Sequence, residues 1–281
     1  MHFRLHRPQS VEEAITLQAQ TGGTYLAGGT VLLVDRRHGK AIGEDLISLE
    51  NLASLREIRE CEGEMIIGAC ATFRELERSA LLRENAFALW QAAGSVGGPQ
   101  VRNRGTIGGN LAAGSPSSDC AAPLLAMGAC LRIRSAEGTR ELPVEELFAG
   151  VGKTYLAPGE LITEIVLPKK ERCVSAFRKV GKRSALAISC INMAVARESA
   201  GGKETVTVAV GAAAPTPRLC KRTSEILSAG VLDEACLDEA CQTILTEIAP
   251  IDDRWATAEY RRMVCVNLLK DILKETEGKV L

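Results

Sequence analysis

The chain has 281 residues and a formal net charge of −1, with 46% hydrophobic and 25% charged residues. This composition is typical of a globular protein with one large or two modest domains. The near-neutral charge and the aromatic content of 4% exclude a basic, base-stacking surface for nucleic acid. No apolar run approaches the ~18 residues of a membrane span, and the first residues lack an apolar signal core, so we expect a cytoplasmic protein.

The cysteines and histidines predict no metal site. Ten cysteines are scattered along the chain without a CxxC pair, and the closest two, Cys236 and Cys241, have no histidine nearby. This spacing argues against a zinc or iron–sulfur site in this chain. We expect reduced, mostly buried thiols. We also expect the three histidines to lie on the surface or in loops: His2, His6 and His38.

The first elements are a helix and three short strands. Ser10 predicts a helix start, and Glu13 completes an S-x-x-E capping box. The apolar segment 24–30 (TYLAGGT) predicts a strand that runs into a double-glycine turn. Apolar runs at 46–49 and 65–67 predict two further strands.

The next stretch alternates helices with a glycine-rich region. Thr72 and Glu75 form a second capping box, and a helix is predicted to run through 87–90 and to stop at Gly94. Residues 94–118 contain seven glycines and show no regular period, which indicates positive φ angles or close contact with another molecule. Asp119 can cap the helix that follows, which is predicted to run through Ala126.

The remainder divides at a charged break. Strands are predicted at 131–135 and 161–167, and the charged residues 169–172 then mark a domain boundary, giving domains 1–170 and 171–281. The second domain is predicted to hold strands at 187–196 and 205–210, with a turn at 198–202, followed by helices. In the last helix an apolar i, i+4 stripe is expected from Tyr260, Val264, Leu268 and Ile272. The C-terminal part is therefore predicted to be a small antiparallel sheet followed by helices.

Two glycine-rich segments carry the chemistry that the sequence offers. They are Leu26–Thr30 (LAGGT) and Gln100–Asn110 (QVRNRGTIGGN). Glycine lets a backbone approach a ligand, and consecutive N–H groups in a turn form a nest for phosphate oxygens. Hydroxyls and positive charge would add to this, from Thr30, Thr106, Arg102 and Arg104. The alternative is that the glycines merely make tight turns. Neither segment fits a P-loop or a Rossmann fingerprint.

Asp119 closes a third segment, 113–119 (AGSPSSD), and has two possible roles. It could cap the next helix, or it could accept hydrogen bonds from ribose or ribityl hydroxyls, and spacing alone does not choose between them. No catalytic acid–base constellation is found, so no catalytic residue is assigned. Binding segments without such a constellation fit a redox role carried by a cofactor.

In order, the motifs AGGT, QVRNRGTIGGN and SPSSD resemble the FAD-binding medium subunit of the xanthine dehydrogenase and carbon monoxide dehydrogenase family. The segments ELITEIVLP, AFRKVGKRSALAIS and TAEYRRMV resemble further parts of these subunits, so the resemblance covers nearly the whole chain.

The resemblance implies a fold, a cofactor and partners. The fold class would be α+β. It would be a vanillyl-alcohol-oxidase-like (PCMH-type) FAD-binding domain of two lobes, followed by a small antiparallel sheet with a helical bundle. The partners would be a [2Fe–2S] subunit and a molybdopterin-binding large subunit. Electrons would pass from molybdenum through the iron–sulfur clusters to FAD and then to NAD or another acceptor. The enzyme would be an oxidoreductase that acts on CH or CH2 groups.

The resemblance also implies the FAD contacts. They would be Leu26, Ala27, Gly28, Gly29, Thr30, Val31, Leu32, Leu33, Thr106, Ile107, Gly108, Gly109, Asn110, Asp119, Ile162 and Lys179. Arg178, adjacent to Lys179, is an alternative for the last position. The chain departs from the family at Val31, where a polar residue is common, and in the more basic segment 34–39. Two other functions stay open: a self-contained flavin oxidoreductase of the same fold, and a non-catalytic assembly module.

Overall fold

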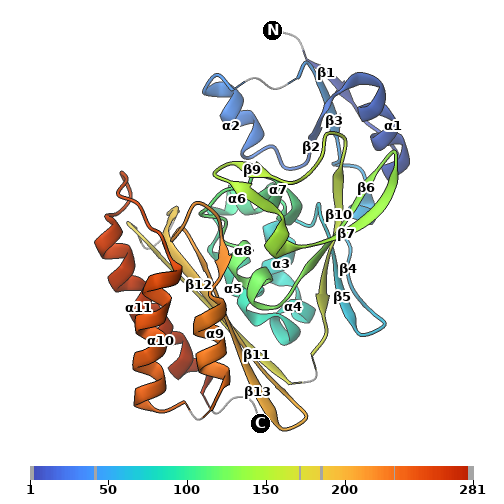
Figure 1. Ribbon diagram of the computed structural model, residues 1–281. Helices are drawn as coiled ribbons and strands as arrows, with labels where there is room; N and C mark the ends of the chain where they lie inside the picture. The colour runs from blue at the N-terminus through green and yellow to red at the C-terminus, as the bar shows by residue number, and fades with distance from the viewer. Residues whose placement is uncertain (1–2, 41–42, 171, 184–185, 231, 278–281) are drawn as a thin grey trace.

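The N-terminal lobe is built on a small parallel sheet, at the top of Figure 1. The computed structural model describes residues 3–40, 43–170, 172–183, 186–230 and 232–277. The strands have the order β1-β3-β2, with β1 at Arg4–His6, β2 at Thr24–Leu26 and β3 at Asp45–Ser48. Helix α1 (Val11–Thr21) packs on this sheet, and the short α2 (Leu32–Arg37) follows the first glycine-rich segment.

The predicted helix start at Ser10 is confirmed, because Ser10 Oγ accepts a hydrogen bond from Glu13 N at 3.1 Å. The Glu13 carboxylate, however, accepts from Gln9 N at 2.7 Å, so only one half of the predicted capping box forms. The strand predicted over 24–30 ends at Leu26. The glycines that follow turn the chain, and Gly29 has a φ of +71°.

A second, antiparallel sheet and a group of short helices form the central lobe. The sheet has the order β4-β5-β10-β6-β7. Its strands are β4 (Ile58–Cys61), β5 (Glu64–Gly68), β6 (Cys130–Ser135), β7 (Gly138–Pro143) and β10 (Leu161–Pro168). The helices are α3 (Phe73–Arg78), α4 (Ala80–Asn85), α5 (Phe87–Ser95), α6 (Pro99–Arg102), α7 (Ile107–Ala112) and α8 (Ala121–Ala126). Minor elements are η1 (Ala53–Leu55), η2 (Val144–Glu146), β8 (Phe148–Gly150) and β9 (Lys153–Thr154).

Two expectations for this lobe were wrong. The stretch 94–118 was predicted to lack regular structure, yet it contains α6, which starts at Pro99, and α7, which Thr106 caps. Asp119 is not the N-cap of α8. That position belongs to Cys120, which makes no side-chain cap, because the Asp119 carboxylate is engaged by residues of the C-terminal sheet.

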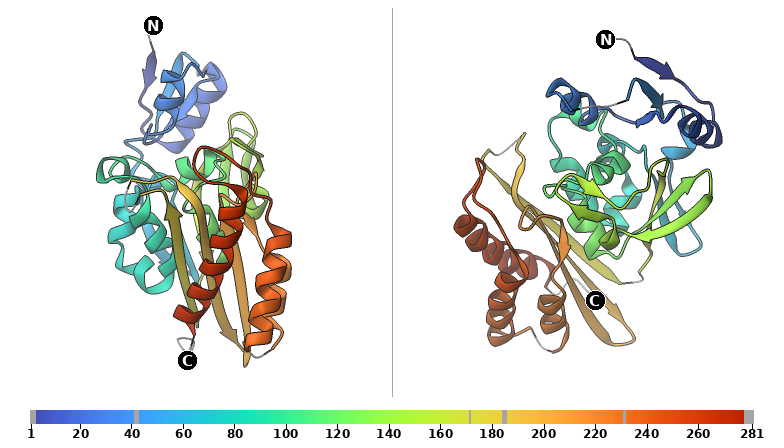
Figure 2. Two further views of the ribbon diagram at one scale, coloured as in Figure 1. Left: turned by 90° about the vertical axis from the view of Figure 1, so that its left-hand side faces the viewer. Right: turned by 45° about the horizontal axis from the view of Figure 1, so that its top comes forward.

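The C-terminal part is an antiparallel sheet of four strands in sequence order, β11-β12-β13-β14. The strands are β11 (Cys173–Gly181), β12 (Ser189–Ala200), β13 (Lys203–Gly211) and β14 (Arg218–Leu219). Helices α9 (Lys221–Ser228), α10 (Glu234–Glu247) and α11 (Ala258–Thr276) cover its outer face, as Figures 1 and 2 show. Helices α5 and α8 of the central lobe cover the other face. Residues 190–196 of β12 are buried and all apolar except Asn192, as expected for a strand that is covered on both faces.

The C-terminal predictions need three adjustments. The turn expected at 198–202 is narrower, because β12 and β13 continue to a hairpin turn at Gly201 and Gly202, both with positive φ. In the stripe of α11, Tyr260 is exposed, whereas the three apolar residues that follow it in the stripe are buried. β11 has no counterpart in the pattern-based prediction. The division after residue 170 stays a prediction, and one apolar core joins the central helices to Phe177 and Ala194.

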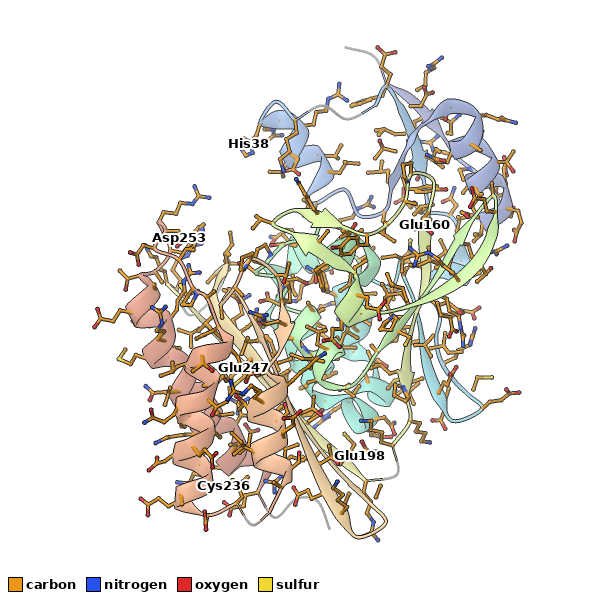
Figure 3. The ribbon with its side chains drawn as sticks, in the orientation of Figure 1. His38, Glu160, Glu198, Cys236, Glu247 and Asp253 are labelled. Carbon is orange, nitrogen blue, oxygen red and sulfur yellow. The ribbon has the colours of Figure 1, made fainter. Side chains whose placement is uncertain are left out.

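The thiols and histidines are distributed nearly as expected. All ten cysteines are free, and only Cys61 is exposed. His38 lies at the outer end of α2 (Figure 3), whereas His6 is in strand β1, with Nε2 2.7 Å from Asp45 Oδ1, and was wrongly expected in a loop or on the surface. His2 lies outside the described residues. None of the helices in the described part of the chain has the length and apolar content to cross a bilayer.

Candidate functional site

The first glycine-rich segment presents four backbone donors in one turn. Among the described residues, the N–H groups of Gly29–Leu32 have no hydrogen-bond acceptor. Two carbonyls of the same segment do accept: Gly29 O accepts from Leu33 N at 3.1 Å, and Val31 O accepts from Asp35 N at 2.8 Å. Successive free N–H groups in a turn form a concave site for an anion. Val31 and Leu33 are exposed beside this turn, with exposed fractions of 47% and 46%.

The second glycine-rich segment uses its backbone donors within the protein. Ile107 N donates to Ala71 O (3.1 Å), Gly108 N to Ala69 O (2.8 Å) and Asn110 N to Thr106 O (3.0 Å). Gly109 N donates to Thr106 Oγ1 at 3.2 Å. The hypothesis that this segment is a nest of free N–H groups is therefore wrong for residues 107–110. It offers instead the exposed backbone of Gly109 and the Asn110 side chain, whose Oδ1 accepts from Ser118 Oγ at 2.6 Å.

Two glycines are required by close contacts inside the protein. A Cβ on Gly28 would lie 1.8 Å from Arg104 O, so the two glycine-rich segments touch backbone to backbone. A Cβ on Gly108 would lie 2.8 Å from Ala69 O. At Gly109 only the Thr106 hydroxyl, at 2.9 Å, would meet the Cβ. The close-approach interpretation thus holds for Gly28 and Gly108 and leaves the Gly109 side open.

The segments also border a small cavity of about 50 Å³, lined by Ala27, Gly28, Thr106 and neighbouring residues.

The positive charges expected beside the second segment are paired. Arg104 Nη1 lies 2.7 Å from Glu50 Oε1, and Arg102 Nε lies 2.8 Å from Glu77 Oε2. Neither guanidinium is therefore a free charge for a phosphate.

Asp119 lies at the centre of a buried polar cluster between the central helices and the C-terminal sheet. Its carboxylate accepts from Lys179 Nζ (2.5 Å), Ser189 Oγ (2.6 Å) and Asn192 Nδ2 (3.3 Å). Lys179 Nζ also donates to Ser95 O at 3.2 Å. Burial raises the pKa of the Asp119 carboxyl, and the Lys179 ammonium and the two neutral donors act in the opposite direction.

Strand β11 separates the two basic residues that the sequence left as alternatives. Lys179 faces Asp119, whereas Arg178 is paired with Glu275 of α11. Side chains alternate between the faces of a strand, so adjacent residues point to opposite sides. The structure thus brings Lys179 together with Asp119. Whether Lys179 touches the cofactor stays a prediction.

Ser189 and Asn192 were missed in the sequence analysis. The available signal was their polarity inside the apolar strand 187–196, since a buried polar group needs a partner. Ile162 lies in β10 and is 5% exposed, in the apolar core that also contains residues of α7. The predicted site residues therefore form three groups: the free turn at 29–32, the α7 segment with Ile162, and the Asp119 cluster.

The chain matches known proteins over nearly its full length. The family model for the FAD-binding domain in molybdopterin dehydrogenase matches residues 1–170, and that for the CO dehydrogenase flavoprotein C-terminal domain matches residues 175–276. A xanthine dehydrogenase FAD-binding subunit from Escherichia coli is 33% identical, with 96% of this chain and 94% of that protein covered. A nicotinate dehydrogenase FAD-subunit from Eubacterium barkeri is 30% identical, with 98% of each chain covered.

Among solved structures, one of reconstituted CO dehydrogenase from Oligotropha carboxidovorans has a TM-score of 0.94 and 28% identity, with 99% of each chain covered. These matches and the α+β, PCMH-type fold place the chain in a class of flavin-binding subunits. The chain belongs to the FAD-binding (medium) subunits of the xanthine dehydrogenase and CO dehydrogenase family, a family of molybdenum hydroxylases. Its cofactor is FAD.

The residues present fit this cofactor. FAD carries an anionic pyrophosphate, and the free donors of Gly29–Leu32 lie in a turn that can receive such a group. Its sugar and ribityl hydroxyls are hydrogen-bond donors, and the carboxylate of Asp119 is an acceptor of the kind that can receive them. Among the described residues, no group of three His, Cys, Asp or Glu could hold a metal ion.

Proposed function

We propose that this chain is the flavin-carrying subunit of a molybdenum-containing hydroxylase. It receives electrons from the [2Fe–2S] clusters of a partner subunit and passes them through FAD to NAD or another acceptor, while a molybdopterin-binding large subunit oxidises a CH or CH2 group of the substrate. The observation that carries the proposal is the match over 94% of a protein that is itself named as an FAD-binding subunit. Metal chemistry in this scheme belongs to the partners.

The proposed contacts follow the three groups of site residues. The N–H groups of Gly29–Leu32 hold the pyrophosphate, with Leu26, Ala27, Gly28 and Leu33 framing the turn. Thr106–Asn110 and Ile162 present an uncharged surface to the cofactor. Asp119 holds its hydroxyl groups, and Lys179 lies beside Asp119. The support is geometric: the first turn has free donors, Gly109 has an open side, and Asp119 and Lys179 are joined by an ion pair.

Bound FAD supplies the redox chemistry, because its ring system takes up and releases electrons. The residues of this chain bind it and fix its position. Four neutral N–H donors can stabilise a pyrophosphate by about 0.5–1.5 kcal/mol each, and more where the acceptor is charged. Lys179 and Asp119 balance each other's charge, so they order the site without adding a net charge to it.

Steady-state turnover tests the proposal. The purified, FAD-loaded chain is assayed with xanthine and NAD, alone and after addition of iron–sulfur and molybdopterin subunits. We expect no substrate oxidation by the single chain and turnover only after reconstitution. Electron transfer from NADH to an artificial dye is expected from the single chain, because it needs only accessible flavin. Robust xanthine turnover by the single chain would contradict the subunit role.

A further inference from the structure

The loop 113–119 is tied to the C-terminal sheet at a strained residue. Ala212, directly after β13, donates its N–H to Pro116 O at 2.7 Å. Ala212 is buried and has a φ of +59°, in the left-handed region that residues with a Cβ rarely adopt. Something must therefore hold this conformation, because the chain does not favour it locally.

Arg261 of α11 holds the other side of Ala212. Its Nη1 donates to Ala212 O at 2.9 Å, and its Nη2 lies 2.7 Å from Asp253 Oδ1. The same carboxylate oxygen accepts from Trp255 N at 2.7 Å and from Ala256 N at 3.1 Å. Figure 3 shows Asp253 beside the start of α11. Arg261 thus bridges the Ala212 turn and the loop that precedes α11.

Burial of the Arg261 guanidinium at this position is unfavourable for the stability of the fold. Its side chain is 6% exposed, and its Nε is buried without a hydrogen-bond partner. A buried guanidinium with an unpaired donor destabilises a fold, and apolar side chains of similar volume often replace buried charges without loss of stability. The planar fork does what an apolar side chain cannot: it fixes a carbonyl and a carboxylate at the same time.

We propose that Arg261 is a positioning residue of the flavin site. It holds Ala212 in the left-handed conformation, and the Ala212 N–H holds Pro116, three residues before Asp119. Asp119 is then presented to Ser189, Asn192 and Lys179 in one arrangement. This inference rests on the proposed role of Asp119 in FAD binding, and it assigns a function to Arg261 in the TAEYRRMV segment.

FAD titration of the deflavinated full-length chain tests the role. Arg261→Met should raise the Kd for FAD about tenfold, in the range known for residues that act on a site without touching its ligand. Arg262→Met is the matched control, because Arg262 is the exposed neighbour on the same helix, and its Kd should stay unchanged. Arg261→Lys keeps the charge and loses the fork, so it should also weaken binding and serves if Arg261→Met does not fold.

The route through Ala212 is tested by rescue. Glycine adopts positive φ without support, so Ala212→Gly combined with Arg261→Met should recover most of the lost affinity, although it cannot replace the lost packing of the arginine. Equal Kd values for Arg261→Met and Arg262→Met, or no recovery in the double variant, would overturn the proposal. Asp119→Asn, measured in parallel, separates the proposed contact of Asp119 with FAD from the proposed positioning role of Arg261. Unchanged binding there removes the proposed Asp119 contact, and with it the inference. Weakened binding there with unchanged binding in Arg261→Met overturns the positioning role alone.

Discussion

In the first glycine-rich segment the N–H groups of Gly29–Leu32 have no acceptor among the described residues, whereas in the second those of Ile107–Asn110 all donate within the protein. Both segments follow the same composition, with adjacent glycines and a threonine. One leaves its donors available for an anionic ligand. The other uses them to fasten α7 to the carbonyls of Ala69 and Ala71.

The difference teaches that a glycine-rich motif does not have one physical meaning. In the second segment position 108 requires glycine, because a Cβ there would collide with Ala69. At Gly109 a Cβ would meet only the Thr106 hydroxyl. In the first segment position 28 requires glycine, because a Cβ there would collide with the backbone of Arg104. Gly29 adopts a positive φ. Adjacent glycines thus serve packing and ligand access in turn, and substitutions can separate the two.

The largest expected effect lies at Asp119, beyond the second segment. Asp119→Ala leaves Lys179 buried without its carboxylate and should lower the free energy of unfolding by about 3–5 kcal/mol. Removing the lysine as well, with Lys179→Met, should recover much of that loss. Chemical denaturation of the FAD-free variants gives both values. A loss of only about 1 kcal/mol would match a helix cap instead and would contradict the cluster.

Identical substitutions at the two adjacent glycines should have opposite consequences. Gly108→Val places atoms against Ala69 and should lower the free energy of unfolding by about 3 kcal/mol. Gly109→Val meets only the Thr106 hydroxyl that caps α7, so it should lower the free energy of unfolding by about 1 kcal/mol, while FAD binding is abolished. Denaturation and flavin absorbance after purification measure the two effects. Normal flavin content in a folded Gly109→Val variant would remove Gly109 from the site.

The two threonines offer a smaller, matched comparison. Thr106→Ala removes the cap on Gly109 N and should lower the free energy of unfolding by about 1 kcal/mol. Thr30→Ala should leave it within about 0.5 kcal/mol and instead weaken FAD binding by about 0.5–1.5 kcal/mol, if its hydroxyl contacts phosphate. Loss of stability in both variants, with unchanged affinity for FAD, would contradict the assignment of different roles to the two threonines.

Hydrogen exchange sharpens the comparison without changing the chain. Without FAD, the amides of Gly29–Leu32 should exchange rapidly and those of Ile107–Asn110 slowly, because only the latter have partners. With FAD bound, the first group should slow by about tenfold or more, since it gains hydrogen-bond acceptors. Mass spectrometry of peptides from the two segments reads this out. Equal exchange in both segments before FAD is added would refute the distinction.

Much of the fold was predictable where the controlling contacts are local. The caps at Ser10 and Thr72 were read correctly, because a cap joins residues three positions apart. The strands at β5, β6, β10 and β13 followed from apolar runs between turn signals. Helix α7 was missed, because six residues with two adjacent glycines carry no helical period. β11 was missed as well, since its sequence mixes basic and apolar residues.

The sequence by itself determined that two glycine-rich segments exist and, through ordered motifs, which family they belong to. It did not determine which backbone donors are free. That was decided by the tertiary structure, since the acceptors for Ile107 and Gly108 belong to Ala71 and Ala69, far away in the chain. The role of Asp119 was decided in the same way. A helix cap depends on neighbours in the chain, but the partners of this carboxylate are Lys179, Ser189 and Asn192, and only the packing of the C-terminal sheet brings them within hydrogen-bond distance.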